Sequence, residues 1–298
     1  MRKGIVLSVG LGTRLYPCTE VISKQLLHVY DKPLIYYPIA TLMMAGISDI
    51  MVITSPENNF QFQTLLRDGS QWGINICYAT QKEPKGIADA LLIAQGFIGK
   101  DDFALILGDN IYYGNDLVNR LERSNRDVWS STLFAYHVSD PERFGVLEFD
   151  EDNRPKRILE KPAVAPSNYA VTGLYFYKNI ALHYANQLKP SHRGELEITD
   201  LNNLLMQNTE VEIEFMNRGI AWIDTGTFDS LADASIFVAS VQKRTGTMIC
   251  CPEEIAFKNE WIDKAQLLES ATKYAKSDYG TYLRKIADEQ RISPIRRY

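Results

Sequence analysis

Residues 4–17 read GIVLSVGLGTRLYP, and this stretch decides the fold. Its first four residues, Gly4–Leu7, form a short apolar run that is typical of a buried strand. The strand opens into Ser8–Arg14, a turn with two glycines, hydroxyl groups and a cation. Such a turn directs several backbone N–H groups toward one point, which favours an anion such as phosphate. Arg14 adds a planar, permanently charged guanidinium that suits phosphate oxygens.

This turn matches neither of the two common glycine-rich phosphate motifs. Gly10 and Gly12 could begin the dinucleotide fingerprint G-x-G-x-x-G, but Leu15 stands where the third glycine belongs. A nicotinamide-dependent dehydrogenase is therefore disfavoured. The P-loop pattern fails as well, because no Gly-Lys-Ser/Thr follows at the required spacing. The turn either binds phosphate by another scheme or is an ordinary turn, and these residues alone leave both open.

The segments that follow the turn favour the phosphate interpretation. Residues 23–27 read SKQLL and residues 30–33 read YDKP. Together with GLGTRL at 10–15, they resemble the sugar-nucleotide pyrophosphorylases, and most closely the bacterial glucose-1-phosphate thymidylyltransferases, also called dTDP-glucose pyrophosphorylases. The resemblance covers nearly all of the chain and includes RGELEITD at 193–200, WIDTGT at 222–227 and PEEIAF at 252–257.

Length and composition indicate a globular protein of a reducing compartment. The chain has 298 residues, 45% of them hydrophobic, which is enough for one large α/β domain with appendages. The net charge of −5 is spread without the basic block that nucleic-acid binding requires, and no apolar run approaches a membrane span. The apolar part of the N-terminus is too short for a signal peptide, and the four cysteines lack metal-binding spacing. We therefore expect a cytoplasmic protein with no nucleic-acid or membrane partner.

Strands and helices alternate in the first half of the sequence. Apolar strands are expected at 49–54, 73–79 and 103–107, and helices at 34–44, 60–66 and 86–98. This alternation predicts a parallel, doubly wound sheet with its ligand site beyond the carboxyl ends of the strands. The fold class that we expect is α/β, with a Rossmann-like, mixed, mostly parallel sheet flanked by helices.

The pattern changes after about residue 128. Strands with short connections are expected at 129–138, 145–150, 157–162, 170–177 and 219–227, and helices at 194–207 and 229–242. These strands predict a β-rich extension of the sheet. We expect a core at 1–240, with a nucleotide-binding half at 1–127 and a sugar-binding half at 128–240, and a helical segment packed on it at 241–298.

Two aspartates lie at the ends of apolar strands. Asp109 follows the strand at 103–107, and Asp224 lies 115 positions further along the chain. Only a sheet can bring them together, and the pair would then make an oxygen site for Mg²⁺. Each aspartate alone is more often a cap or turn residue. The metal-site interpretation of the pair is favoured when the glycine turn, Arg14 and Lys24 are considered together with it.

The resemblance implies roles for these and other residues. It implies that Mg²⁺ is the cofactor, held by Asp109 and Asp224, and that the catalytic residues are Arg14, Lys24, Asp109, Lys161 and Asp224. The nucleotide-binding residues that it implies are Gly10, Gly12, Thr13, Arg14, Gln25, Gln81 and Gly86. The sugar-binding residues that it implies are Asn110, Gly145, Glu160, Lys161, Val171 and Gly173.

The reaction that the resemblance implies is nucleotidyl transfer. A phosphate oxygen of α-D-glucose 1-phosphate attacks the α-phosphorus of dTTP in line, which gives dTDP-glucose and pyrophosphate without a covalent enzyme intermediate. The resemblance also implies a homotetramer. It further implies a second site, at which a dTDP-sugar inhibits the enzyme, near Arg218, Cys251, Glu254, Ile255 and Lys258.

Several positions depart from the family pattern and keep alternatives open. Val9 stands where the family has a glycine in the phosphate turn, Lys258 where it often has arginine, and His28 where it commonly has proline. The segment 81–88, QKEPKGIA, differs from the usual base-reading sequence. The first alternative is therefore the same chemistry with UTP, another nucleotide or another hexose 1-phosphate. The second is a nucleotide-sugar sensor in which Val9 prevents turnover but permits binding.

Overall fold

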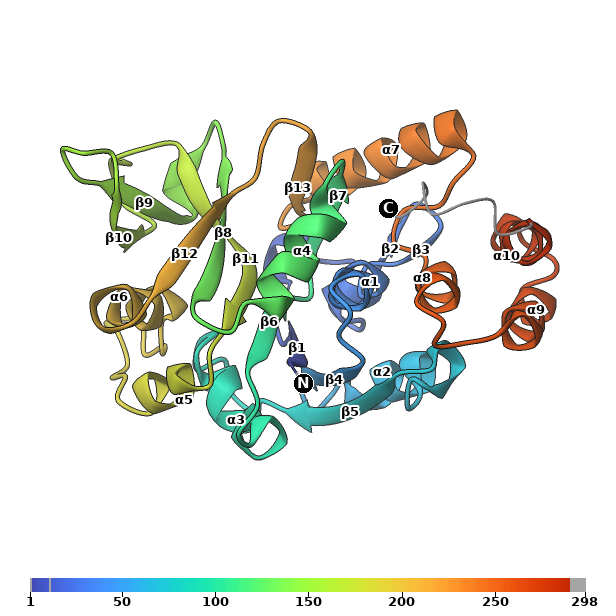
Figure 1. The fold of residues 1–298 in the computed structure, drawn as a ribbon, viewed down its shortest axis with the longest axis horizontal. Helices are drawn as coiled ribbons and strands as arrows, with labels where there is room; N and C mark the ends of the chain where they lie inside the picture. Colours follow the sequence, from blue (N-terminus) through green and yellow to red (C-terminus); the bar gives the residue numbers. More distant parts are fainter. Residues whose placement is uncertain (1, 11, 290–298) are drawn as a thin grey trace.

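A nine-stranded mixed sheet runs through the molecule (Figure 1). The structure is a computed structural model, and it describes residues 2–10 and 12–289; Leu11 of the phosphate turn lies outside the described residues. Four parallel strands are adjacent in the order β6-β1-β4-β5, and their bounds are Phe103–Leu107, Lys3–Ser8, Asp49–Thr54 and Asn75–Thr80. The expected parallel sheet of the first half is therefore present.

One long strand joins the two halves of the sheet. β11 (Tyr169–Tyr177) runs antiparallel to β6, so the sheet continues without a break into the second half. The strands that extend it are β8 (Ser131–His137), β9 (Gly145–Phe149), β10 (Pro155–Glu160) and β12 (Val211–Phe215). Because β11 pairs antiparallel with both β8 and β9, the sheet is mixed, as the sequence predicts.

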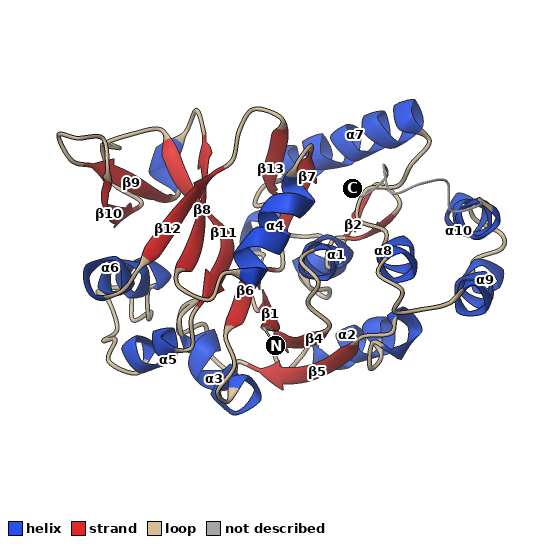
Figure 2. Cartoon of the chain, viewed as in Figure 1, coloured by secondary structure: helices blue, strands red, loops and turns tan. Residues whose placement is uncertain are grey.

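Helices cover both faces of the sheet (Figure 2). The helices of the first half are α1 (Tyr36–Met44), α2 (Asn59–Leu66), α3 (Asp89–Ile98) and α4 (Leu117–Arg126). In the second half they are α5 (Ile180–Ala185) and α6 (Ile198–Asn208). Along β1, Val6 belongs to the apolar cluster around α1, whereas Ile5 belongs to the cluster around α3. Successive side chains of a strand point to opposite faces, so both faces of β1 are buried.

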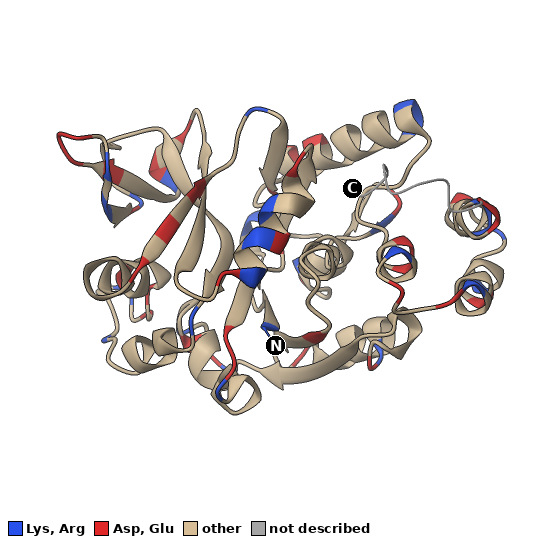
Figure 3. Ribbon diagram, in the orientation of Figure 1, with Lys and Arg blue, Asp and Glu red and all other residues tan. Residues whose placement is uncertain are grey.

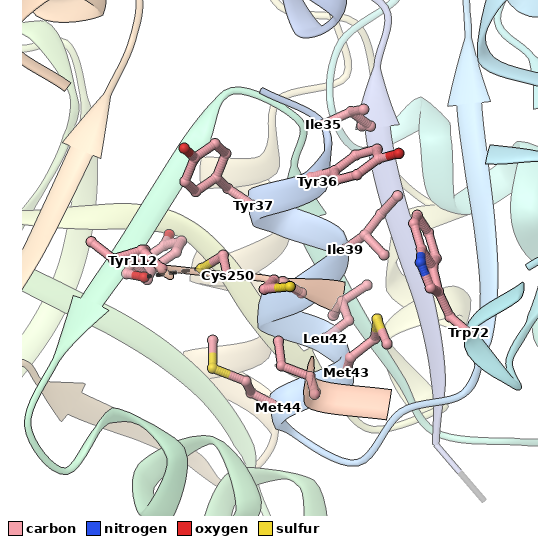
Figure 4. Close-up of a cluster of buried hydrophobic side chains, with 14 of the residues drawn as sticks. Ile35, Tyr36, Tyr37, Ile39, Leu42, Met43, Met44, Trp72, Tyr112 and Cys250 are labelled. Carbon is pink, nitrogen blue, oxygen red and sulfur yellow. Dashed lines mark hydrogen bonds between the residues drawn. The ribbon is translucent and has the colours of Figure 1, made fainter. Parts of the chain in front are cut away.

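Helix α1 is buried on every side. All nine of its residues are buried, because the helix lies between the sheet and α8 (Pro252–Lys258). Figure 4 shows Tyr36 and Tyr37 leaving α1 in opposite directions, and the Tyr36 ring meets the Trp72 ring edge-on at 5.2 Å. Gly46, in the left-handed conformation at φ 81°, follows the end of the helix.

The C-terminal helices lie at the end of the molecule opposite the β9–β10 hairpin (Figure 1). They comprise α8, α9 (Lys264–Lys273) and α10 (Asp278–Asp288), and α7 (Phe228–Thr245) precedes them. The predicted boundary at residue 240 falls inside α7. The last part of the predicted segment 241–298, from residue 290 onward, lies outside the described residues. Within the described part, every helix is too short or too polar to cross a bilayer.

Only one strand of the two-stranded ribbon beside the main sheet was predicted from the sequence. β13 (Ile220–Asp224) matches the predicted strand, but its partner β7 (Asn110–Gly114) was not predicted. A second small ribbon, β2 (His28–Val29) with β3 (Lys32–Pro33), precedes α1. Helices α4 and α5 and strand β12 were also not expected.

Charges of both signs are intermixed along the chain (Figure 3). Figure 3 shows basic positions on α4 and acidic positions on β12. Arg120 and Arg123 of α4 both pair with Glu214 of β12, which is a buried carboxylate. Such a pair of guanidinium groups compensates the charge that burial leaves on the carboxylate. The contact fastens α4 to the edge strand of the sheet.

Candidate active site

A cleft of about 390 Å³ opens at the carboxyl ends of β1 and β6. Its walls come from both halves of the sheet. Residues of the first half that line it and that the sequence predicts are Gly10, Gly12, Thr13, Arg14, Lys24, Gln25, Asp109 and Asn110. Those of the second half are Gly145, Glu160, Lys161, Val171, Gly173 and Asp224. The structure therefore brings together the predicted catalytic residues and all the predicted sugar-binding residues in one cleft.

The β7–β13 ribbon brings the two aspartates together. Asn110 and Asp224 are opposite each other in its register, and the backbone carbonyl of Asp109 accepts hydrogen bonds from Thr225 N at 3.2 Å and Thr225 Oγ1 at 2.9 Å. Lys24 enters from the other side, with its Nζ 2.6 Å from Asp109 Oδ2. Two carboxylates and a buried ammonium group thus meet at one end of the cleft.

Electrostatics at this end favour a bound cation. Burial raises the pKa of Asp224, and the negative charge of Asp109 raises it further, although Lys24, Arg143 and Arg14 act in the opposite direction. A divalent cation between the carboxylates would remove the repulsion between them. Carboxylate oxygens are the ligands that Mg²⁺ accepts, together with water and phosphate oxygens. The pair therefore fits Mg²⁺.

The glycine turn borders the same end of the cleft. Gly12 adopts the left-handed conformation at φ 62°, and its carbonyl accepts a hydrogen bond from Thr19 Oγ1 at 2.7 Å. Arg14, which follows it, is exposed and lines the cleft. Val9 lies elsewhere: its side chain packs in the apolar cluster around α3 and does not line the cleft. The side chain of Val9 is therefore part of the core, and its effect on nucleotide binding stays a prediction.

The end of β10 contributes a second charged group to the cleft. Glu160 Oε2 accepts a hydrogen bond from Thr199 Oγ1 at 2.6 Å, and Glu160 Oε1 lies 3.7 Å from Lys161 Nζ. The Lys161 backbone has φ 41°, a strained value for a residue with a side chain, and its N–H donates to Phe144 O at 2.9 Å. This strained turn places a cation directly beside an acid that ends β10.

Gly173 lets β11 pass close to Leu107 and Asn110. A Cβ atom on Gly173 would lie 2.6 Å from Leu107 Cδ1 and 3.0 Å from Asn110 Oδ1. The pairing of β11 with β8 also shifts register between Val171 and Tyr175. A side chain at residue 173 would therefore displace Leu107 or Asn110, and glycine lets β11 approach both closely.

The cleft contains functional residues that sequence reasoning missed. Arg143 lies 3.8 Å from Asp224, and Arg193 forms a two-point ion pair with Glu197, at 3.0 and 2.7 Å. Trp222 donates from Nε1 to Asn110 Oδ1 at 2.6 Å. Arg193 and Trp222 stand in two of the blocks that carry the family resemblance, RGELEITD at 193–200 and WIDTGT at 222–227, and Arg143 stands two residues before the predicted Gly145. Membership of these blocks could have suggested Arg193 and Trp222 as site residues, but the sequence does not indicate which side chains they contact.

Gln81 and Gly86 are not lining residues of the cleft. Gln81 is buried, and its Nε2 donates to Gly86 O at 3.2 Å and to Asp89 Oδ2 at 2.7 Å. Around Gly86 the backbone pairs with Leu196, which donates to Lys85 O at 2.7 Å and accepts from Ala88 N at 3.2 Å. The predicted base-reading loop is therefore hydrogen-bonded to the loop that carries Arg193 and Glu197.

The residues predicted for a second site are distributed over two regions. Arg218 is exposed in the turn between β12 and β13. The other four lie at the start of α8 or within it, and three of them, Cys251, Glu254 and Ile255, are buried. Lys258 pairs with Glu254, with Nζ 2.7 Å from Oε1. Their assignment to an inhibitor site stays a prediction.

Comparison with known proteins agrees with this geometry. The profile of the nucleotidyl transferase family matches residues 3–241. A glucose-1-phosphate thymidylyltransferase of Xanthomonas campestris is 52% identical over 286 residues, which cover 96% of this chain and 97% of that one. The Mycobacterium tuberculosis protein of the same name is 49% identical over 286 residues, which cover 96% of this chain and 99% of that one.

Two solved structures share the architecture. A Bacillus anthracis protein named as a glucose-1-phosphate thymidylyltransferase, in complex with sucrose, superposes with a TM-score of 0.74 at 38% identity, over 80% of this chain and 95% of that one. A UDP-glucose pyrophosphorylase with UDP-glucose gives a TM-score of 0.71 at 25% identity, over 82% and 100%. Profile, sequences and structures agree, so the dehydrogenase alternative is not supported. The chain belongs to the nucleotidyl transferase family and, within it, to the glucose-1-phosphate thymidylyltransferases.

Proposed function

We propose that the chain transfers a nucleotidyl group from dTTP to α-D-glucose 1-phosphate, which gives dTDP-glucose and pyrophosphate. The observation that carries this proposal is the cleft itself. Lys24, Asp109 and Asp224 meet in it, and Glu160 and Lys161 line the same cleft from β10 and the turn that follows. Two anionic substrates need cations around the point where they react, because their phosphates repel each other as they approach.

The chain's own residues bring the two reacting groups together. The turn at Gly10 and Gly12 and the side chain of Arg14 bind the triphosphate, and Lys24 stabilises the negative charge that develops on the departing pyrophosphate. Lys161 binds the phosphate of the sugar and directs its oxygen toward the α-phosphorus. The attack is in line and direct, so positioning and charge neutralisation supply the rate enhancement.

Asp109 and Asp224 hold Mg²⁺ in this proposal. When bound there, the metal ion polarises the α-phosphate of the nucleotide. The hard oxygen donors of the pair and the raised pKa of Asp224 support this assignment.

Pyrophosphate release tests the proposal directly. The protein is incubated with glucose 1-phosphate and Mg²⁺, and separately with dTTP, UTP, CTP, ATP or GTP. Fastest release with dTTP is the expected result. Fastest release with UTP would keep the mechanism and favour the alternative that the similarity to a UDP-glucose pyrophosphorylase supports. No release with any nucleotide would overturn the enzyme proposal.

The packing of the Val9 side chain in the core supports the enzyme over the sensor alternative. Asp224→Ala separates the two functions. An enzyme loses turnover with this substitution, whereas a sensor keeps its metal-free ligand binding unchanged. Turnover by the wild type, abolished in Asp224→Ala, is the expected pair of results.

Three further expectations stay part of the proposal. They are a homotetramer, a cytoplasmic location, and inhibition by a dTDP-sugar at a second site near Arg218 and α8. Light scattering of the purified chain measures the oligomeric state. Pyrophosphate release at increasing dTDP-sugar concentration measures the inhibition, and Lys258→Ala is expected to weaken it if the site includes Lys258.

A further inference from the structure

Asn110 has hydrogen-bond partners at both ends of its side-chain amide. It is 2% exposed, and its Oδ1 accepts from Trp222 Nε1 at 2.6 Å. Its Nδ2 donates to Asp109 Oδ1 at 2.9 Å. The hydroxyl of Tyr112 lies 3.4 Å from Oδ1 and contributes a longer contact. Asn110 therefore connects an aromatic side chain of β13 to the carboxylate that follows β6.

The chain of contacts continues through Asp109. Its second oxygen, Oδ2, lies 2.6 Å from Lys24 Nζ. Both oxygens of the Asp109 carboxylate therefore have partners, one neutral donor and one cation. These partners fix the rotation of the carboxylate at the end of the cleft where Asp224 also lies.

Trp222 and Asp109 both select the same orientation of the Asn110 amide. An amide has nearly the same shape when its oxygen and nitrogen are exchanged, but the exchanged form would direct its oxygen at the Asp109 carboxylate and repel it. An indole N–H can only donate a hydrogen bond, so Trp222 favours the orientation in which the amide oxygen of Asn110 faces it. A tyrosine hydroxyl can donate or accept, so Tyr112 cannot make this distinction.

The indole itself is held firmly. The Trp222 ring packs at 5.1 Å from the Phe144 ring and at 6.0 Å from the Tyr136 ring. Its backbone pairs with Tyr112 in the ribbon. An indole N–H that is held in one position can fix the orientation of the neighbouring Asn110 amide.

We propose that Trp222 is a positioning residue for the cation site: its N–H fixes the Asn110 amide, and the amide orients the Asp109 carboxylate toward the cleft. This role differs from the sugar contact predicted for Asn110. The inference rests on the Mg²⁺ site of the proposed function. Partners of this kind typically change metal affinity by about 10–100-fold when they are removed.

A double-mutant cycle on metal binding tests the inference. The variants are Trp222→Phe, Asn110→Leu and the two combined, and the probe is Mn²⁺ titrated by electron paramagnetic resonance without nucleotide or sugar. Trp222→Phe is expected to weaken Mn²⁺ binding about tenfold. The combined variant is expected to bind as Asn110→Leu does, because Trp222 acts through Asn110. Trp129→Phe, at a side chain 85% exposed on the surface, is the matched control and should bind as the wild type does.

Several outcomes would overturn the inference. One is a Trp222→Phe protein that binds Mn²⁺ within twofold of the wild type, and another is a combined variant whose loss is the sum of the single losses. Failure of the wild type to bind Mn²⁺ would also overturn it, while pyrophosphate release would still decide the proposed function separately. If the Trp222→Phe protein does not fold, a measurement on the wild-type protein tests the inference instead. Saturating Mg²⁺ is expected to shift the Trp222 indole N–H resonance but not that of Trp129, and an unshifted Trp222 resonance contradicts the inference.

Discussion

Lys24 is a buried lysine, 6% exposed, with Asp109 as its ion-pair partner. Substitution Lys24→Gln removes the charge and keeps a polar side chain. We expect kcat for pyrophosphate release to fall about 10²–10³-fold, because a preorganised cation acts on charge that develops in the transition state. Steady-state kinetics with dTTP and glucose 1-phosphate measure this effect.

Lys32 is the matched control for this substitution. It is 3% exposed and pairs with Asp31 at 2.5 Å, but it does not line the cleft. Lys32→Gln is expected to lower stability and to leave kcat within about twofold of the wild type, since only stability depends on this pair. Equal losses of kcat in both variants would show that Lys24 acts through folding.

The acidic and basic residues of the cleft could be predicted from the sequence more fully than the side chains that contact them. Asp109 and Asp224 could be expected to meet only if a sheet paired the segments that carry them, and the ribbon of β7 and β13 does so. Trp222 could not be linked to Asn110, because the contact depends on a ribbon register between residues that are far apart in the chain. The direction of the Val9 side chain could not be predicted for a related reason: from the sequence alone, it could point either into the core or into the cleft.

The loop around Gly86 connects the segment predicted to read the base to the loop at Leu196. Gly86 has φ 101°, and a Cβ atom there would lie 2.4 Å from Leu196 O. Gly86→Ala is therefore expected to cost about 1–3 kcal/mol of unfolding free energy and to raise KM for both substrates. Urea denaturation and steady-state kinetics give the two values.

Gly96 is the matched control on α3. A Cβ atom there meets nothing within 4 Å, and the residue lies inside a helix. Gly96→Ala is expected to stabilise the protein by up to about 1 kcal/mol, because alanine favours the helix. A loss of stability in Gly96→Ala equal to that in Gly86→Ala would contradict the role of the Leu196 contact.

The start of α8 contains two cysteines with low expected reactivity. Burial raises the pKa of Cys250 to about 12, and it also raises the pKa of Cys251. A thiolate is the reactive form, so both should react slowly at neutral pH, whereas the exposed Cys18 should react fast. A thiol reagent followed over time is expected to label Cys18 first. Rapid labelling of Cys250 in folded protein would show that α8 opens readily.

Elements with strong local signals could be predicted, and those that depend on distant partners could not. α1 could be predicted from an apolar run that ends at Gly46. β7 could not, because Asn110–Gly114 becomes a strand only by pairing with Ile220–Asp224. The register of such a ribbon is set by packing and not by the local sequence.

At the scale of the whole molecule, one sheet passes through both predicted halves. β6 and β11 pair directly, so neither half can lose its strands without exposing an edge of the other. We expect a single cooperative unfolding transition. Hydrogen exchange should give amides of β4 and of β11 the same opening free energy and the same denaturant dependence. Earlier opening of β11 would show that the halves unfold separately.

The position of β13 in the chain has a consequence for synthesis on the ribosome. Lys24 and Asp109 are made long before Asp224, which emerges 115 residues after Asp109. Until then, the ammonium group and the carboxylate can neutralise each other, as they do in the folded protein. A chain whose translation stops before β13 therefore lacks the second carboxylate and the Trp222 contact that orients the first. Incomplete products are expected to bind neither metal ion nor nucleotide productively, so that only the finished protein can consume substrate.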